Sequence, residues 1–516
     1  MGFLRHTQHM GLAALIMGGS IVLSRFMGLL RDKVISWQFG ASGEADLYFA
    51  AFVVPDFINY LLAGGYVSIT LIPLLARRFE EDAEDAWRFF SAVFWWALLV
   101  STLLTALAWW QAPQLSAWVA PGFSPEQLHR LAYFLRIILP AQVFFLAGAC
   151  FSALLFLRRQ FYIPALTPLL YNGMIIAGGL LMPLLGGAQG MEGFCWGVTV
   201  GAAVGAFALP WWAAASGGAL RIFPVLRHPL MRRFLCIALP LMLGQSVVML
   251  NEQFMRIFGS LVGDGAVSLL SYARRISQVP VGMVGQAAAV ASYPFLAALV
   301  AQGATARFGQ TLSTALNTSL SLCIPLSAWM IAMATPTMCL IFYGGNFGMA
   351  ETLASAPLLQ IMMLAVPLWV VQMLLGRAFY AQGDTLTPAL VGTAMTIVSI
   401  PAFLLVKTAY GIALITSLGV AAYVGALVVL WLRRQGRGAF VGLQHTLVWS
   451  LGCSTLAAVP AAYAAQYSMT LALLPVLAAL LALAVGGLLF AAIYVPLIYW
   501  RAPTLLEPII RRFRKK

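Results

Sequence analysis

Apolar segments long enough to cross a lipid bilayer recur along the whole of this 516-residue chain. Hydrophobic residues make up 62% of it and charged residues only 9%, whereas soluble domains are about 25% charged. A helix that crosses a bilayer needs about 20 apolar residues. Fourteen segments meet that need: residues 10–37, 46–76, 89–112, 127–156, 162–185, 193–215, 235–260, 266–299, 309–343, 353–380, 386–408, 411–432, 445–466 and 470–500. The sequence therefore predicts an all-α integral membrane protein with about fourteen transmembrane helices, since membrane β-strands are shorter and alternate in polarity.

The basic residues are distributed unevenly between the two sides of the membrane that these spans define. Cytoplasmic loops are enriched in Lys and Arg. If the N-terminus is cytoplasmic, two thirds of the 30 Lys and Arg residues fall in cytoplasmic segments. The opposite loops instead carry Glu44, Glu126, Glu192, Asp264 and Glu351. We therefore expect both termini in the cytoplasm, with the first span retained rather than cleaved as a signal peptide.

Several classes of function are disfavoured by what the chain lacks. The connections between spans are short, so we expect no soluble domain that could hold an active site. Neither a phosphate-binding glycine loop nor a zinc-protease motif is present. The six cysteines lie in or beside apolar runs and the five histidines are scattered, so we expect no catalytic residues, no metal and no cofactor. The net charge of +14 belongs mostly to cytoplasmic loops facing anionic lipid, and a nucleic-acid partner is not expected.

Charged residues inside the first span point to a polar interior. Arg25, Arg31, Asp32 and Lys33 lie within nine residues of one apolar segment. A charge at membrane depth costs at least a few kcal/mol, so it persists where it faces a cavity or a partner. One interpretation is an anion-binding cavity. The other is an internal salt-bridge cluster in which Asp32 and Asp46 neutralise the arginines, and such a cluster is also compatible with a resting binding site.

The seventh and eighth spans carry a second group of charges. Arg274 and Arg275 are adjacent and point about 100° apart on a helix, so at least one should face the protein interior. Pro280 follows and favours a bend. Glu252 and Arg256 have the i, i+4 spacing of an intrahelical ion pair, and they are also candidates for a coupling or counter-ion site. Arg274 paired with Glu252 is a further structural alternative.

The excess of arginine indicates the charge of the cargo. A guanidinium is always ionised and presents a planar fork of donors that matches phosphate. A drug exporter for cations would instead need buried acids in excess. We therefore expect a phosphate or pyrophosphate group on the cargo.

Motifs along the chain resemble one known family. They are SRFMGLLRDKVISWQFGASGEADLYFAAFVVPDF at 24–57, APGF at 120–123, RRQFYIPALTPLLYN at 158–172, YARRISQVPVGMVG at 272–285, FYGGNF at 342–347 and RAFYAQGDTLTP at 377–388. Each motif alone is weak, but their order along nearly the whole chain resembles the MurJ (MviN) lipid II flippases of the MOP superfamily.

The resemblance implies two six-helix lobes arranged in a V, residues 1–220 and 221–438, followed by a C-terminal helix pair with a basic tail, residues 439–516. It implies a flippase of the bacterial cytoplasmic (inner) membrane that moves undecaprenyl-pyrophosphate-linked peptidoglycan precursor from the inner to the outer leaflet by alternating access. The substrate-binding residues it implies are Arg25, Arg31, Asp46 and Arg275, with Asp32 and Arg274 beside them. The expected partners are this lipid, membrane lipids and cell-wall synthesis proteins.

Some residues depart from the family pattern and keep other readings open. Asn59-Tyr60 stands where the family usually has a basic pair, so the cargo could be another polyprenyl-linked oligosaccharide. A membrane glycan polymerase or transferase is an alternative of another class. Coupling to Na⁺, to H⁺ or to the membrane potential is equally compatible with the sequence.

Overall fold

The structure is a computed structural model that describes residues 10–62, 66–184, 190–216, 220–436 and 440–503. Within these ranges almost every residue is helical and no β-strand occurs; an isolated bridge joins Gly344 and Phe347. The chain divides into two compact units, Met1–Ser268 and Leu269–Lys516. The all-α prediction is confirmed.

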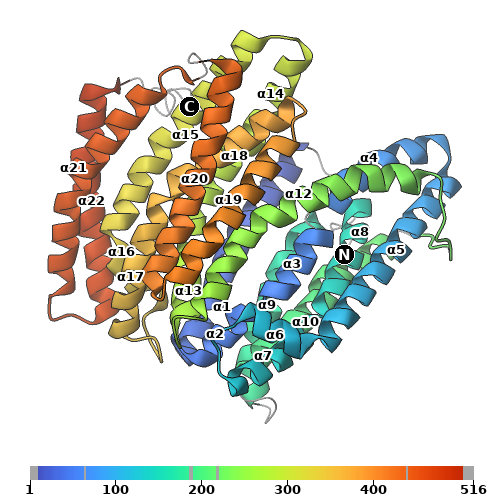
Figure 1. The fold of residues 1–516 in the computed structure, drawn as a ribbon, viewed down its shortest axis with the longest axis horizontal. Helices are drawn as coiled ribbons and strands as arrows, with labels where there is room; N and C mark the ends of the chain where they lie inside the picture. The colour runs from blue at the N-terminus through green and yellow to red at the C-terminus, as the bar shows by residue number, and fades with distance from the viewer. Residues whose placement is uncertain (1–9, 63–65, 185–189, 217–219, 437–439, 504–516) are drawn as a thin grey trace. The chain divides into compact units, whose positions relative to one another are not determined.

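Unit 1 holds twelve α-helices and one π-helical segment in its described part (Figure 1). They are α1 (Met10–Phe39), α2 (Gly43–Ala50), α3 (Val53–Leu62), α4 (Tyr66–Glu81), α5 (Ala83–Trp110), α6 (Ala112–Val119), α7 (Pro125–Ile138), α8 (Ala141–Leu157), α9 (Tyr162–Leu184), α10 (Glu192–Gly201), η2 (Ala202–Ala208), α11 (Leu209–Ala215) and α12 (Leu230–Gly259). The chain passes into unit 2 within α13 (Ala266–Pro280).

Unit 2 continues with a second π-helical segment and a further set of long helices. They are η3 (Val281–Gln286), α14 (Ala287–Ala301), α15 (Thr305–Ala332), α16 (Ala334–Phe342), α17 (Met349–Leu364), α18 (Val366–Ala381), α19 (Leu386–Leu405), α20 (Ala409–Gln435), α21 (Leu443–Met469) and α22 (Pro475–Arg501). Several of the predicted spans are therefore built from two consecutive helices rather than one.

Twelve helical stretches in the described ranges are long and apolar enough to cross a membrane. They match all the predicted spans except the first and the seventh, which correspond to α1 and α12. The side chains of residues 10–16 and 21 in α1 and of residues 240–252 in α12 lie outside the described part. The membrane-spanning class is thus confirmed, and the count of fourteen stays a prediction.

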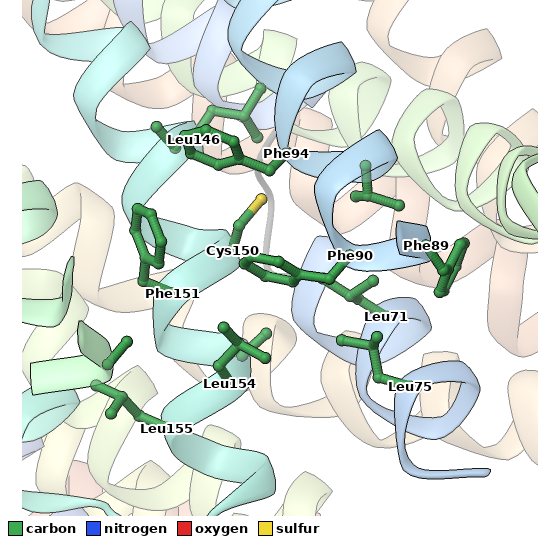
Figure 2. Close-up of a cluster of buried hydrophobic side chains, with 14 of the residues drawn as sticks. Leu71, Leu75, Phe89, Phe90, Phe94, Leu146, Cys150, Phe151, Leu154 and Leu155 are labelled. Atoms are coloured by element: carbon green, nitrogen blue, oxygen red, sulfur yellow. The ribbon is translucent and has the colours of Figure 1, made fainter. Parts of the chain in front are cut away.

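Unit 1 is held together by an aromatic core (Figure 2). Phe90 and Phe94 of α5 face Cys150 and Phe151 of α8, with Leu71 of α4 beside them. The rings of Phe94 and Phe151 lie 5.2 Å apart at 50°. Lipid tails are as apolar as these side chains, so helices in a membrane associate through close packing rather than through exclusion of water. Interlocking rings supply that packing here.

The segment between α11 and α12 is fastened to α5. The indole Nε1 of Trp95 donates to the carbonyl oxygen of Phe223 at 2.9 Å, and that of Trp96 donates to the carbonyl of Leu226 at 2.8 Å. The amide of Phe223 donates to the hydroxyl of Ser91 at 3.0 Å. Because α12 then packs on α3 and α4, it belongs to unit 1. The predicted division at 220/221 and 438/439 stays a prediction.

In unit 2, α21 and α22 run side by side as an antiparallel pair (Figure 1). Small residues line their contact, among them Ala457 and Ala461 of α21 and Ala482 of α22, all fully buried. Small side chains let helix backbones approach closely in a membrane. The helical path from α13 to α14 is interrupted by the π-helical turn η3, directly after Pro280. The proline had predicted an irregularity at this place, and proline cannot donate the regular backbone bond.

Candidate substrate site

The charged cluster of the first span is buried inside unit 1. Nη2 of Arg31 lies 2.8 Å from Oδ1 of Asp32, and its Nε donates to the same oxygen at 2.9 Å. Its Nη1 donates to Oδ1 of Asn172, on α9, at 3.2 Å. Arg31 is 8% exposed and Asp32 1%. This arrangement is the internal ion pair that the sequence had left open beside direct cargo binding.

Arg25 and Lys33 lie on the same helix and are only partly buried. Both make further interactions within the protein. Ser20, one and a half turns before Arg25, donates its hydroxyl to the carbonyl oxygen of Ala165 on α9. Polar contacts therefore connect α1 to α9 at more than one level of the helix. Of the two arginines of α1, Arg25 has the larger exposed surface.

Asp46 caps the start of α13. Its side chain, fully buried on α2, accepts the backbone amide of Gly265 at 2.7 Å and that of Ser268 at 2.6 Å. A carboxylate at a helix N-terminus satisfies amides that have no partner within the helix and interacts well with the helix dipole. The structure thus gives Asp46 a capping role that the sequence did not indicate. Its contact with substrate stays a prediction.

Arg274 and Arg275 belong to unit 2 and are half-buried on α13. The guanidinium of Arg274 lies over the ring of Trp369, on α18, 4.9 Å from its centroid. An aromatic face can hold a cation in place while leaving donors at the guanidinium edge. Both arginines make further interactions. The proposed pairing of Arg274 with Glu252 concerns a side chain outside the described residues.

Arg256 has a partner that the spacing did not predict. Its Nη1 donates to Oδ2 of Asp56, on α3, at 2.9 Å and to Oε1 of Gln253 at 3.3 Å. The expected partner Glu252 has a side chain outside the described part, so the intrahelical pair stays a prediction. Asp56 and Asn172 are the polar residues that sequence reasoning missed. Both stand inside apolar runs, which was the available signal.

Of the predicted site residues, Arg25, Arg31, Asp32 and Asp46 belong to unit 1, and Arg274 and Arg275 belong to unit 2. Unit 1 brings Arg31, Asp32 and Asn172 together and separately joins Arg256 to Asp56. The joint binding of one ligand by Arg25, Arg31 and Arg275 stays a prediction. The expectations that the protein has no catalytic residues and binds no metal also stay predictions. Among the described residues, no group of three or more His, Cys, Asp and Glu side chains is arranged to hold a metal.

A helical chain with many candidate membrane spans and ionised groups among them is a polytopic membrane protein. The family model described as lipid II flippase MurJ matches residues 35–483. The chain belongs to this family. Proteins of the family are transporters. The prediction that the chain is a transporter rather than an enzyme is therefore confirmed for the family as a class.

Relatives and solved structures agree with this assignment. A lipid II flippase MurJ from Burkholderia cenocepacia is 28% identical over 437 residues, covering 82% of this chain and 84% of the relative. A probable lipid II flippase MurJ from Rhizobium meliloti is 28% identical over 378 residues, covering 72% and 70%. A structure of lipid II flippase MurJ in an inward closed conformation superposes with a TM-score of 0.74 at 22% identity, over 94% of this chain and 100% of that one. A multidrug resistance MATE transporter of the MOP superfamily shares the fold with a TM-score of 0.65 at 15% identity, over 80% and 95%.

Proposed function

We propose that this protein moves undecaprenyl-pyrophosphate-linked peptidoglycan precursor, lipid II, from the inner to the outer leaflet of the cytoplasmic membrane. The observation that carries the proposal is the family match over residues 35–483. The arginines at membrane depth agree with it, because a pyrophosphate needs cations along its path through a medium that does not solvate charge.

The proposed binding step uses exposed and buried arginines differently. Arg25 and Arg275, which are partly exposed, bind the pyrophosphate oxygens directly. Arg31 is held by Asp32 and Asn172, so in this resting arrangement it stabilises the site through its position and through its charge. A bidentate guanidinium–phosphate contact is among the strong charge-assisted hydrogen bonds. Release of the lipid then requires that the contacts between the arginines and the pyrophosphate be broken on the outer side of the membrane.

Alternating access is the transport cycle we propose. One lobe rocks against the other around the bound headgroup, as in transporters built from repeated halves, while the polyprenyl tail stays in lipid. Moving one elementary charge across 100 mV is worth about 2.3 kcal/mol. We propose the membrane potential as one drive for the return of the positively charged empty site, with coupling to Na⁺ or H⁺ as an equal alternative.

We propose that both termini are cytoplasmic. The support is the distribution of basic residues: Arg77, Arg78, Arg158, Arg159 and Arg307 lie in or beside the connections assigned to that side. The positive-inside rule concerns short loops of this kind. Cysteine labelling from outside, at Cys residues placed in the loops on each side, tests the orientation.

Complementation tests the cargo. The chain is expressed in a bacterium depleted of its own lipid II flippase, and survival is scored together with exposure of lipid II on the outer leaflet. Rescue that is lost in Arg25→Ala and Arg275→Ala supports the proposal. A folded, membrane-inserted protein that fails to rescue contradicts it.

Asn59 and Tyr60 favour a second candidate cargo. They replace a basic pair by neutral residues on α3, so the cationic set differs from the one the resemblance implies. Failure to rescue would therefore favour another polyprenyl-linked oligosaccharide, carried by the same fold. Direct comparison of the two lipids as transported substrates in vesicles separates these candidates.

A further inference from the structure

The ion pair between Arg256 and Asp56 is partly exposed and joins two helices of unit 1. The two side chains are 23% and 30% exposed, respectively. They come from α12 and α3, helices that pack against each other within unit 1. A partly exposed ion pair on apolar helices is costly unless its open side meets water or a ligand.

The helix termini explain why the two charges rest where they do. Arg256 stands in the last turn of α12, and Asp56 stands in the first turn of α3. A cation is favoured at a helix C-terminus and an anion at an N-terminus. Each charge is therefore stabilised by its own helix, which lowers the cost of the pair when no ligand is bound.

Among the described residues, the guanidinium of Arg256 donates through one of its three nitrogens. Nη1 donates to both Asp56 and Gln253. In the described part of the chain, Nε and Nη2 of Arg256 have no acceptor. Nε and Nη2 together form the side of the guanidinium that binds two oxygens of one phosphate at once. Asp56 thus fixes the plane of the guanidinium, and no acceptor among the described residues occupies this side.

We propose that Arg256 is a further pyrophosphate-binding residue of the transport path, and that Asp56 positions it. The inference rests on the proposed function, since it names a contact for the same lipid. Nε and Nη2 donate to the pyrophosphate while Nη1 stays on Asp56. Asn59 and Tyr60 lie three and four residues after Asp56 and therefore on the same face of α3. Arg256 of α12 thus places a cation beside a stretch of α3 that contains no basic residue.

Opposite changes to the two partners separate binding from a purely structural role. Binding of undecaprenyl pyrophosphate is measured in nanodiscs of zwitterionic lipid, with undecaprenol as the uncharged control. Arg256→Gln removes the positive charge and the guanidinium fork, and it is expected to weaken pyrophosphate binding about tenfold or more without affecting undecaprenol. Asp56→Asn keeps an acceptor for Nη1 but removes a negative charge, so affinity is expected to stay equal or to increase. Equal losses in the two variants would mean a structural pair and would overturn the proposal.

Two further variants keep the test interpretable. Arg256→Lys preserves the charge and the contact with Asp56 but lacks the fork, so an intermediate loss is expected even if the glutamine variant does not fold. Arg130→Gln is the matched control: Nε and Nη1 of Arg130 already donate to Glu44 and Glu192, and its loss should leave pyrophosphate affinity unchanged.

The outcomes distinguish the inference from the proposed function. If the unaltered protein binds the pyrophosphate lipid and transports lipid II, yet Arg256→Gln binds equally well, only the role of Arg256 is wrong. If the unaltered protein neither binds undecaprenyl pyrophosphate nor transports lipid II, the proposed function fails and the inference fails with it.

Charge relocation provides a final check. In Asn59→Arg combined with Arg256→Gln, the new guanidinium starts from the face of α3 that carries Asp56. Recovery of at least half of the lost affinity is expected if the requirement is for a cation at this place. No recovery in a folded double variant would indicate that the site requires the geometry of Arg256 itself and would contradict the relocation argument.

Discussion

Arg31 on α1 donates a hydrogen bond to Asn172 on α9 at 3.2 Å, across 141 positions of sequence. Asn172 is 7% exposed and anchors its own amide nitrogen on the carbonyl of Pro168 at 2.8 Å. The asparagine is therefore held in one orientation, with its oxygen toward the guanidinium. Because Asp32 occupies the other side of Arg31, the two acceptors together determine where this buried charge points.

Replacing Asn172 by Leu should impair transport by misplacing Arg31. A hydrogen bond to a charged group contributes about 1.5–3 kcal/mol, so a loss of transport of about tenfold or more is expected. Lipid II exposure in depleted cells is the measurement, normalised to the amount of protein in the membrane. Asn172→Asp keeps the acceptor oxygen and serves as the control; equal activity of the leucine variant would rule out this positioning role.

Replacing Asp46 by Ala should lower stability through the loss of a helix cap. Its carboxylate accepts the amides of Gly265 and Ser268, and removal of a capping side chain costs about 0.5–2 kcal/mol. Thermal unfolding in detergent should shift to lower temperature, and Asp46→Asn should lose less than the alanine variant. An unchanged unfolding temperature combined with lost transport would instead assign Asp46 to substrate binding.

The connection between α18 and α19 should respond to acid. Partial burial raises the pKa of Asp384, but hydrogen bonds from Thr387 and the nearby Arg434 outweigh it and hold the pKa below its usual value. A carboxylate with a lowered pKa stabilises the fold at pH values above its unfolded pKa of about 3.9, and that contribution disappears as pH falls through the folded value.

Asp384→Asn should therefore be less stable than the unaltered protein near neutral pH. The difference in unfolding temperature should shrink as the pH is lowered below about 4. Because the side chain of Arg434 is 44% exposed, salt should reduce the effect as well. A difference that stays constant across this pH range would show that the charge of Asp384 does not contribute.

Gly148 on α8 should tolerate no side chain. A Cβ there would meet the carbonyl oxygen of Ala206 in η2, which is backbone and cannot move aside as a flexible side chain would. Overpacking of this kind typically costs about 1–3 kcal/mol, so Gly148→Ala should reduce folded yield and unfolding temperature. Gly425→Ala on α20 is the matched control, since nothing lies within 4 Å of the added carbon; it should be neutral or stabilising.

The class of the protein could be predicted from the sequence because membrane insertion depends on local composition. A run of about 20 apolar residues has few alternatives to a spanning helix, and Lys and Arg in short loops indicate orientation. The charges of α1 could be singled out in the same way, since their position within an apolar run is itself the anomaly. Span boundaries were less certain, because pairs such as α7 with α8 form one crossing from two helices.

The pairings of those charges were decided only by the tertiary structure. The i, i+4 rule indicated Glu252 for Arg256 and that pair stays a prediction, whereas helix packing brings Asp56 to Arg256 from 200 positions away. Likewise, Asp46 looked like a counter-ion for arginine and instead caps a helix that begins 220 residues later. Local spacing determines which residues share a helix face, whereas the partner of a buried charge depends on which helices pack together. That packing comes from the shapes of many side chains at once, and no short motif encodes it.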